Sequence, residues 1–208
     1  MDCRGCLYRG GESLSSFKQA IYFGDIGFKL HDTMIYEKNS ASFPAKKDSK
    51  RYTQIFEYMF VFVKGEIRKD IQLLADKPNK WAGTQSWGNL TYYGKDGKLV
   101  SRGDKCKPIA EYGMRNNIWK YTVSLDKDNK DIRHPAIFPE KLAEDHIKSW
   151  SVKGDVVLDP FAGSGTTGKM AILNGRDFIG IELNPDFYQK GKARVQWAEQ
   201  LYSSYLFK

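Results

Sequence analysis

The segment that most constrains this chain is VVLDPFAGSGTTGKMAILNGRDFIGIE, residues 156 to 182. An apolar run ends in Asp159, a glycine-rich turn and a helix-like stretch follow, and a second apolar run ends in Glu182. This layout is typical of a nucleotide-cofactor pocket, because glycines allow the backbone to approach a ligand closely. The segment stands near the end of the 208 residues, so we expect earlier residues to supply whatever completes the sheet and acts on the substrate.

The spacing within this segment predicts the kind of ligand. Glycines stand at positions 163, 165 and 168, and the helix after them is expected to end near Gly175. Glu182 follows Gly165 by 17 positions, where a carboxylate can accept hydrogen bonds from both hydroxyls of a ribose. The pattern therefore predicts a site for an adenosine-type cofactor.

Two cofactors fit the glycines. Gly163, Gly165 and Gly168 also satisfy the G-x-G-x-x-G pattern of nicotinamide-dependent oxidoreductases. Only 26 residues follow Glu182, which is short for a dinucleotide fold, and Asp159 would repel a pyrophosphate but attract the positively charged amino-acid end of S-adenosylmethionine. We therefore favour S-adenosylmethionine, with the nicotinamide and a purely structural strand–turn–helix as alternatives.

The overall composition suits one α/β domain that carries an insertion. Hydrophobic residues make up 41% of the chain, and the formal net charge is +8. Residues 64 to 130 hold 14 Lys or Arg and 8 Asp or Glu, whereas residues 131 to 208 hold 10 of each. The excess of positive charge is regional, and it favours a polyanionic partner for that region.

Cysteine usage and hydropathy indicate a cytoplasmic protein with no membrane partner. Three cysteines cannot all pair, and no signal peptide or apolar span is visible. Cys3 and Cys6 form a lone C-x-x-C without further ligands at regular spacing, so we expect no metal site.

Periodicity predicts a helix over 14 to 24, a strand over 28 to 36 that is interrupted at Asp32, and a central strand covered on both faces over 57 to 63. A helix is expected over 140 to 150, with Pro139 in its first turn.

Between Lys64 and Asn117 the chain is an irregular insertion in which lysines alternate with separated aromatic residues. Such a surface suits nucleic acid, because Lys and Arg neutralise phosphates while aromatic faces pack on sugars and bases. The alternative is a solvated loop whose tryptophans fill a small satellite core.

Three motifs resemble those of DNA amino-methyltransferases of the β arrangement, which modify adenine N6 or cytosine N4. They are Asp159-Pro-Phe-Ala-Gly-Ser-Gly-Thr-Thr-Gly, Glu182-Leu-Asn and His134-Pro-Ala-Ile-Phe-Pro-Glu-Lys-Leu. Residues 27 to 39, 51 to 65 and 117 to 121 also resemble parts of that family.

The resemblance implies a Rossmann-like α/β methyltransferase fold that acts on double-stranded DNA. It implies a substrate-side part over 1–65, a target-recognition insertion over 66–116 and a cofactor-binding part over 117–208. The residues that it implies as S-adenosylmethionine contacts are Asp159, Phe161, Gly163, Gly165 and Glu182, with His134 and Phe138 on the other side of the cofactor.

The chain departs from that family at the catalytic tetrapeptide, an Asp, Asn or Ser followed by Pro-Pro and an aromatic residue. No Pro-Pro pair occurs in this sequence, and Asp159-Pro-Phe and Asn184-Pro-Asp each have one proline within the cofactor half. The missing motif would hold the amine of a flipped-out base. We therefore expect the chain to begin partway through the family's domain and to be inactive alone.

Two explanations of that departure remain open. One is a split enzyme, completed by a second chain that carries the missing motif, and the other is the remnant of a disrupted gene. A noncatalytic DNA-binding protein is the alternative from another functional class. The target site and the choice between adenine and cytosine stay open.

Overall fold

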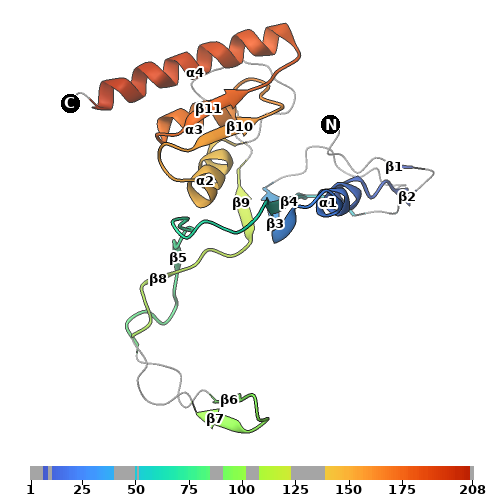
Figure 1. The fold of residues 1–208 in the computed structure, drawn as a ribbon, viewed down its shortest axis with the longest axis vertical. Coiled ribbons are helices and arrows are strands. Elements are labelled where there is room, and N and C mark those ends of the chain that lie inside the picture. Colours follow the sequence, from blue (N-terminus) through green and yellow to red (C-terminus); the bar gives the residue numbers. More distant parts are fainter. Residues whose placement is uncertain are drawn as a thin grey trace. The chain divides into compact units, whose positions relative to one another are not determined.

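The computed structural model describes residues 7–8, 11–39, 50, 52–84, 91–101, 108–122 and 139–206 (Figure 1). They belong to two compact units, one made of residues 1–72 with 117–208 and the other of Leu73–Asn116. The helices of the larger unit are α1 (Ser15–Asp25), α2 (Glu140–Trp150), α3 (Thr166–Leu173) and α4 (Pro185–Leu206). Its strands are β1 (Leu7–Tyr8), β2 (Gly11–Glu12), β3 (Lys29–Lys38), β4 (Phe56–Val63), β9 (Ile118–Tyr121), β10 (Val156–Asp159) and β11 (Asp177–Gly180).

The first sheet of the larger unit has the order β4-β3-β9, in which β3 is antiparallel to β4 and parallel to β9. The register of β3 and β4 shifts between Leu30 and Asp32, where the sequence predicted an interruption. Met34 and Tyr36 are both 3% exposed, as the predicted alternation along this strand requires. The predicted strand over 28 to 36 is confirmed as β3, and the predicted helix over 14 to 24 is confirmed as α1.

The strand predicted over 57 to 63 is covered on both faces as expected, but its predicted central position is wrong, because β3 is central and β4 lies at the edge of the described sheet. The sequence of β4 is apolar because both of its faces have partners. Phe62 stacks on Phe23 of α1 at 5.1 Å between ring centroids, and the Met59 sulfur lies 3.1 Å from His146 Nε2 of α2. An edge strand with two covered faces has the same apolar sequence as a central one.

The second sheet contains β10 and β11 in parallel register, with Val156 opposite Asp177. Helix α3 contacts both strands, and it also contacts α2 and α4 (Figure 1). The core on this side of the sheet contains Ala143, Ile147, Met170 and Ala171, with Val157, Leu173 and Phe178 packed against it. The predicted strand, turn and helix are confirmed, and so is the α/β fold class.

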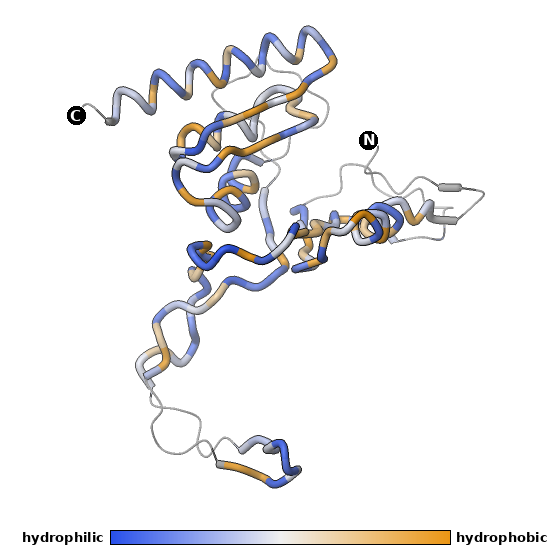
Figure 2. The backbone as a smooth tube through the Cα atoms, viewed as in Figure 1, coloured by the Kyte–Doolittle hydropathy of each residue, from blue (hydrophilic) through white to orange (hydrophobic). Residues whose placement is uncertain are grey.

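The opposite face of β10 and β11 is apolar and exposed. Figure 2 shows hydrophobic residues over much of both strands. The exposed residues are Val156 (58%), Leu158 (58%), Ile179 (54%) and Ile181 (56%). Within the described ranges, β11 is the one strand that pairs with β10, so the other edge of β10 has no strand partner there.

The smaller unit contains two antiparallel pairs, β5 (Lys77–Pro78) with β8 (Tyr112–Gly113) and β6 (Thr91–Tyr93) with β7 (Leu99–Ser101). Arg115 forms an ion pair with Asp76 in which Nε donates to Oδ1 at 2.9 Å. The unit ends at the same residue as the predicted 66–116 insertion, whose role stays a prediction.

No helix in the described parts combines the length and the hydropathy needed to cross a membrane. Within the same ranges, no group of three His, Cys, Asp or Glu side chains could hold a metal ion. Cys3, Cys6 and Cys106 lie outside the described residues.

Candidate cofactor site

The glycine turn between β10 and α3 depends on glycine at two positions. Gly163 and Gly165 have φ angles of 52° and 80°, in the left-handed region that side chains disfavour. A Cβ atom on Gly165 would also lie 2.9 Å from the backbone of Gly191 in α4. Both the backbone conformation and the close packing on α4 therefore exclude a side chain at Gly165.

The carboxylate of Asp159 is held at the end of β10. Its Oδ1 accepts a hydrogen bond from the Phe161 amide at 3.0 Å, and its Oδ2 accepts one from Thr167 Oγ1 at 2.6 Å. The Asp-Pro-Phe segment is thus a side-chain-to-backbone turn at the strand end. This geometry agrees with assigning the segment to the cofactor half.

The carboxylate of Glu182 is held two residues after β11. Its Oε2 accepts a hydrogen bond from the Gly163 amide and its Oε1 accepts one from the Asn184 amide, both at 2.8 Å. Asn184 Oδ1 in turn accepts from the Asp186 amide at 2.9 Å, and Pro185 is the first residue of α4. Asn-Pro-Asp is therefore a helix cap followed by a proline in the first turn.

Two exposed apolar side chains stand next to these acids in the sequence. Phe161 is 68% exposed and Leu183 is 97% exposed. Sequence reasoning singled out Phe161 but missed Leu183, although an apolar residue directly after a strand-end acid was visible.

A cavity of about 300 Å³ lies between the glycine turn and α4. Gly163, Gly165 and Glu182 line it, whereas Asp159 and Phe161 do not. A ligand that touches all five residues would therefore extend along the strand ends beyond this cavity.

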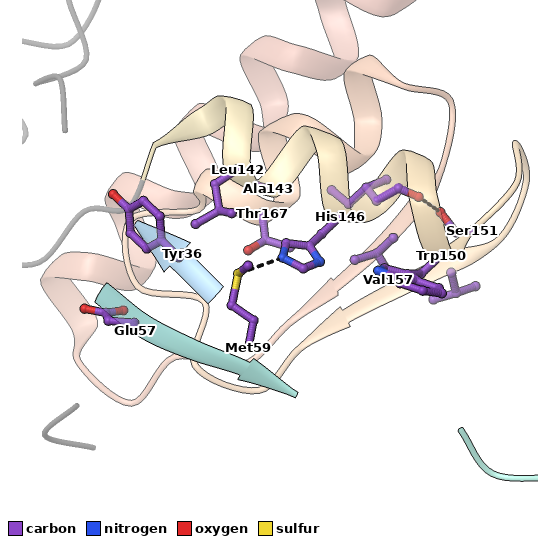
Figure 3. A pocket seen from close by; sticks show the side chains of 12 residues that line it. Tyr36, Glu57, Met59, Leu142, Ala143, His146, Trp150, Ser151, Val157 and Thr167 are labelled. Carbon is purple, nitrogen blue, oxygen red and sulfur yellow. Dashed lines mark hydrogen bonds between the residues drawn. The ribbon is translucent and has the colours of Figure 1, made fainter. Parts of the chain in front are cut away.

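A larger, open cavity of about 580 Å³ is lined by residues of α2, β3, β4, β10 and α3 (Figure 3). Its lining is mostly apolar and includes Tyr36, Met59, Trp150 and Val157. Thr167, which bonds to Asp159, also lines it, so the cavity borders the strand end that holds the first acid. Neither Asp159 nor Glu182 lines this larger cavity.

His146 lines the larger cavity. Its imidazole lies against the Met59 sulfur (Figure 3). It also packs on Trp119, with 4.7 Å between ring centroids. Burial lowers the pKa of His146 from 6.5 to about 4, and the charge of Asp145 partly opposes that shift. The imidazole that faces this cavity is therefore uncharged at neutral pH.

The structure brings five of the seven predicted contacts together on one strand–turn–helix–strand unit. These are Asp159, Phe161, Gly163, Gly165 and Glu182. His134 and Phe138 lie outside the described residues. Thr167 and Gly191, which hold Asp159 and the glycine turn, were not predicted because their roles depend on packing between segments.

A parallel strand pair, a glycine turn into a helix and two strand-end acids define a Rossmann-like nucleotide-cofactor domain. The family model described as "DNA methylase" matches residues 8–193. The chain therefore belongs to the DNA methylase family, whose members use S-adenosylmethionine. The family assignment confirms the predicted cofactor and excludes the nicotinamide alternative.

Curated relatives and a solved structure agree with this assignment. The chain is 51% identical over 192 residues to orphan methyltransferase M.BamHII of Bacillus amyloliquefaciens, covering 91% of this chain and 71% of that protein. It is 31% identical over 171 residues to the DNA adenine methyltransferase YhdJ of Escherichia coli K12, covering 82% of this chain and 54% of the relative. The crystal structure of an M1.HpyAVI–SAM complex is similar at a TM-score of 0.53 and 27% identity, over 91% of this chain and 71% of that one.

Proposed function

We propose that this chain binds S-adenosylmethionine at the glycine turn and contributes the cofactor-binding and DNA-contacting parts of a DNA amino-methyltransferase. The reaction is methyl transfer to the exocyclic amine of adenine (N6) or cytosine (N4) in double-stranded DNA. The observation that carries the proposal is the pair of strand-end carboxylates, Asp159 and Glu182, each held by two hydrogen bonds on either side of the turn.

Each part of the cofactor has a suitable group in this site. A carboxylate oxygen accepts more than one hydrogen bond, so Glu182 can receive ribose hydroxyls while it keeps the Gly163 and Asn184 amides. Asp159 suits the cationic amino group, and the exposed side chains of Phe161 and Leu183 suit the adenine face. When bound, S-adenosylmethionine supplies an electrophilic methyl group.

The smaller unit has the surface that DNA contact requires. Trp81, Tyr92 and Tyr93 are 47%, 53% and 74% exposed, and the Lys80 ammonium lies 5.3 Å from the centroid of the Trp81 indole. Exposed aromatic residues next to lysines can pack on sugars and base edges while the lysines neutralise phosphates. These side chains support a DNA-reading role for residues 73–116.

The proposal includes a further segment with the Asp- or Ser-Pro-Pro-aromatic motif, in this chain's partner or in a longer polypeptide. The support is the exposed apolar face that contains Val156 and Leu158, the free edge of β10 among the described residues, and the adjacent apolar cavity. A strand with unpaired amides and an apolar face suits an added strand. Without that segment, we expect no methyl transfer.

Cofactor binding is tested first, by calorimetric titration of S-adenosylmethionine into the purified chain. We expect saturable binding that Glu182→Ala abolishes and that Glu66→Ala preserves, since Glu66 is an exposed acid paired with Lys29 outside the site. Wild-type chain that is folded by circular dichroism but does not bind would refute the proposed site. Salt-sensitive DNA binding that is unchanged by the cofactor and by Glu182→Ala would instead favour a noncatalytic DNA-binding protein.

Methyl transfer is tested with tritiated S-adenosylmethionine and unmethylated DNA. We expect no incorporation by the chain alone, and incorporation after adding a polypeptide from a relative that carries the Pro-Pro motif. Incorporation by the chain alone would overturn the requirement for a further segment, and the same added polypeptide with its Pro-Pro pair replaced is the control.

A further inference from the structure

Three charged side chains from three different helices meet behind the glycine turn. Glu140 is the first residue of α2, Lys169 belongs to α3 and Arg194 belongs to α4. Glu140 Oε1 accepts a hydrogen bond from Lys169 Nζ at 2.8 Å and another from the Arg194 guanidinium. The side chains of Lys169 and Arg194 are 5% and 2% exposed, and that of Glu140 is 30% exposed.

Arg194 also bonds to the glycine turn. Arg194 Nη1 donates to Thr166 Oγ1 at 3.0 Å, and the Ser164 carbonyl oxygen lies 3.5 Å from the same nitrogen. Ser164 and Thr166 are themselves 5% and 4% exposed, and they flank Gly165. One planar guanidinium therefore connects the carboxylate of α2 with the two residues on either side of the turn's second glycine.

The three side chains carry two positive charges and one negative charge. Two buried cations share one carboxylate, and the Lys169 ammonium lies 5.1 Å from the centroid of the Trp197 ring. Removing Glu140 would leave two desolvated cations without this carboxylate, so its loss should be strongly destabilising. Glu140 also follows Phe138 by two positions, so the cluster lies next in sequence to the predicted contacts on the cofactor's other side.

We infer that Arg194 is a positioning residue for the cofactor site, acting through Ser164 and Thr166 to fix the glycine turn relative to the start of α2. This inference rests on the proposed S-adenosylmethionine site. Arg194 does not touch the cofactor in this scheme. Its planar fork is the essential feature, because an ammonium is a point charge that cannot span both partners in the same geometry.

The test compares Arg194→Lys with Arg176→Lys. Arg176 is another buried arginine, 8% exposed, whose guanidinium donates to Ser151 and to the Asn174 carbonyl, away from the turn. We expect Arg194→Lys to raise the Kd for S-adenosylmethionine about tenfold or more, while Arg176→Lys changes it by less than about threefold. Both variants should lower the melting temperature of the cofactor-free chain, so a difference in Kd between them would not come from stability alone.

A second pair of variants tests whether the effect passes through Thr166. Thr166→Val removes the hydroxyl acceptor and should raise the Kd, whereas Thr166→Ser keeps it and should restore wild-type binding. In the double variant of Arg194→Lys and Thr166→Val, the effects should be less than additive, as expected of contacting groups. This pair still decides the question if Arg194→Lys does not fold.

The two proposals fail in distinguishable ways. A wild-type chain that binds no S-adenosylmethionine overturns the cofactor site and this inference together. Wild-type binding with an unchanged Kd in Arg194→Lys, or with equal increases in Arg194→Lys and Arg176→Lys, overturns the inference alone. An unchanged Kd in Thr166→Val has the same consequence.

Discussion

Replacing Gly191 by alanine should separate cofactor affinity from folding. Gly191 is buried within α4, and its ideal Cβ would lie 3.1 Å from the Gly163 carbonyl oxygen and 3.3 Å from the Gly165 nitrogen. Ordinary contact starts at 3.4 Å, so the glycine turn would have to move by about 0.3 Å. Gly191 is not among the glycines with positive φ, so alanine introduces no backbone strain of its own.

Two effects on the free energy of unfolding oppose each other in this variant. Alanine is favoured over glycine inside a helix by about 1 kcal/mol, and overpacking costs about 1–3 kcal/mol. The net change in the free energy of unfolding is therefore between about zero and a loss of about 2 kcal/mol. Affinity has no such compensation, because small displacements of positioned groups weaken binding, and we expect a Kd on the order of tenfold higher.

The measurements are urea unfolding and calorimetric titration of S-adenosylmethionine. Gly24→Ala is the matched control, because Gly24 lies in α1 and its ideal Cβ meets nothing within 4 Å. The control should leave the Kd unchanged. A Gly191→Ala chain with wild-type affinity would refute the reasoning, since it would show that the turn tolerates the added methyl group without loss of function.

Three further predictions concern other parts of the larger unit. Glu182→Gln should weaken the binding free energy of S-adenosylmethionine by about 1.5–3 kcal/mol, as measured by calorimetry, because hydrogen bonds to a charged acceptor are replaced by weaker ones. Burial lowers the pKa of His146 to about 4, so the unfolded chain binds the extra proton between pH 6.5 and 4, and stability should fall by up to roughly 3 kcal/mol as the pH drops through that window. His146→Leu should flatten this dependence in urea titrations, and an unchanged slope would contradict the assignment. Arg176→Met should destabilise the chain by about 1–3 kcal/mol because the Ser151 carbonyl loses its guanidinium donor, and urea unfolding with wild-type stability would count against that role.

Most of the helices and strands were predicted from residues that lie close together in the sequence. The apolar runs and the glycines predicted the extents of strands and helices, and Asp32 marked the register shift within β3, since each acts on the backbone within a few residues. Helix α3 ends at Leu173, and Gly175 follows with a φ of 76°, as the glycine pattern predicted. The acids at 159 and 182 were placed correctly at the strand ends for the same reason.

The position of β4 and the supports of the glycine turn could not be read from local pattern. An apolar strand has the same sequence signature whether its neighbours are strands or helices, so the edge position of β4 was hidden. Gly191 and Arg194 follow Gly165 by more than 20 positions, and their importance comes from close contact with the turn. Nothing in their immediate sequence distinguishes them from ordinary helix residues.

The packing of the second sheet divides cofactor binding from methyl transfer. Helices α2, α3 and α4 all pack on the side of Phe178, and the cluster around Arg194 links the same three helices. The apolar side that contains Leu158 takes no part in that packing. Because the supports of the glycine turn lie on the packed side, the turn keeps its geometry without any strand added to β10. S-adenosylmethionine binding should therefore persist under conditions in which methyl transfer is absent, and the two activities should respond to different substitutions.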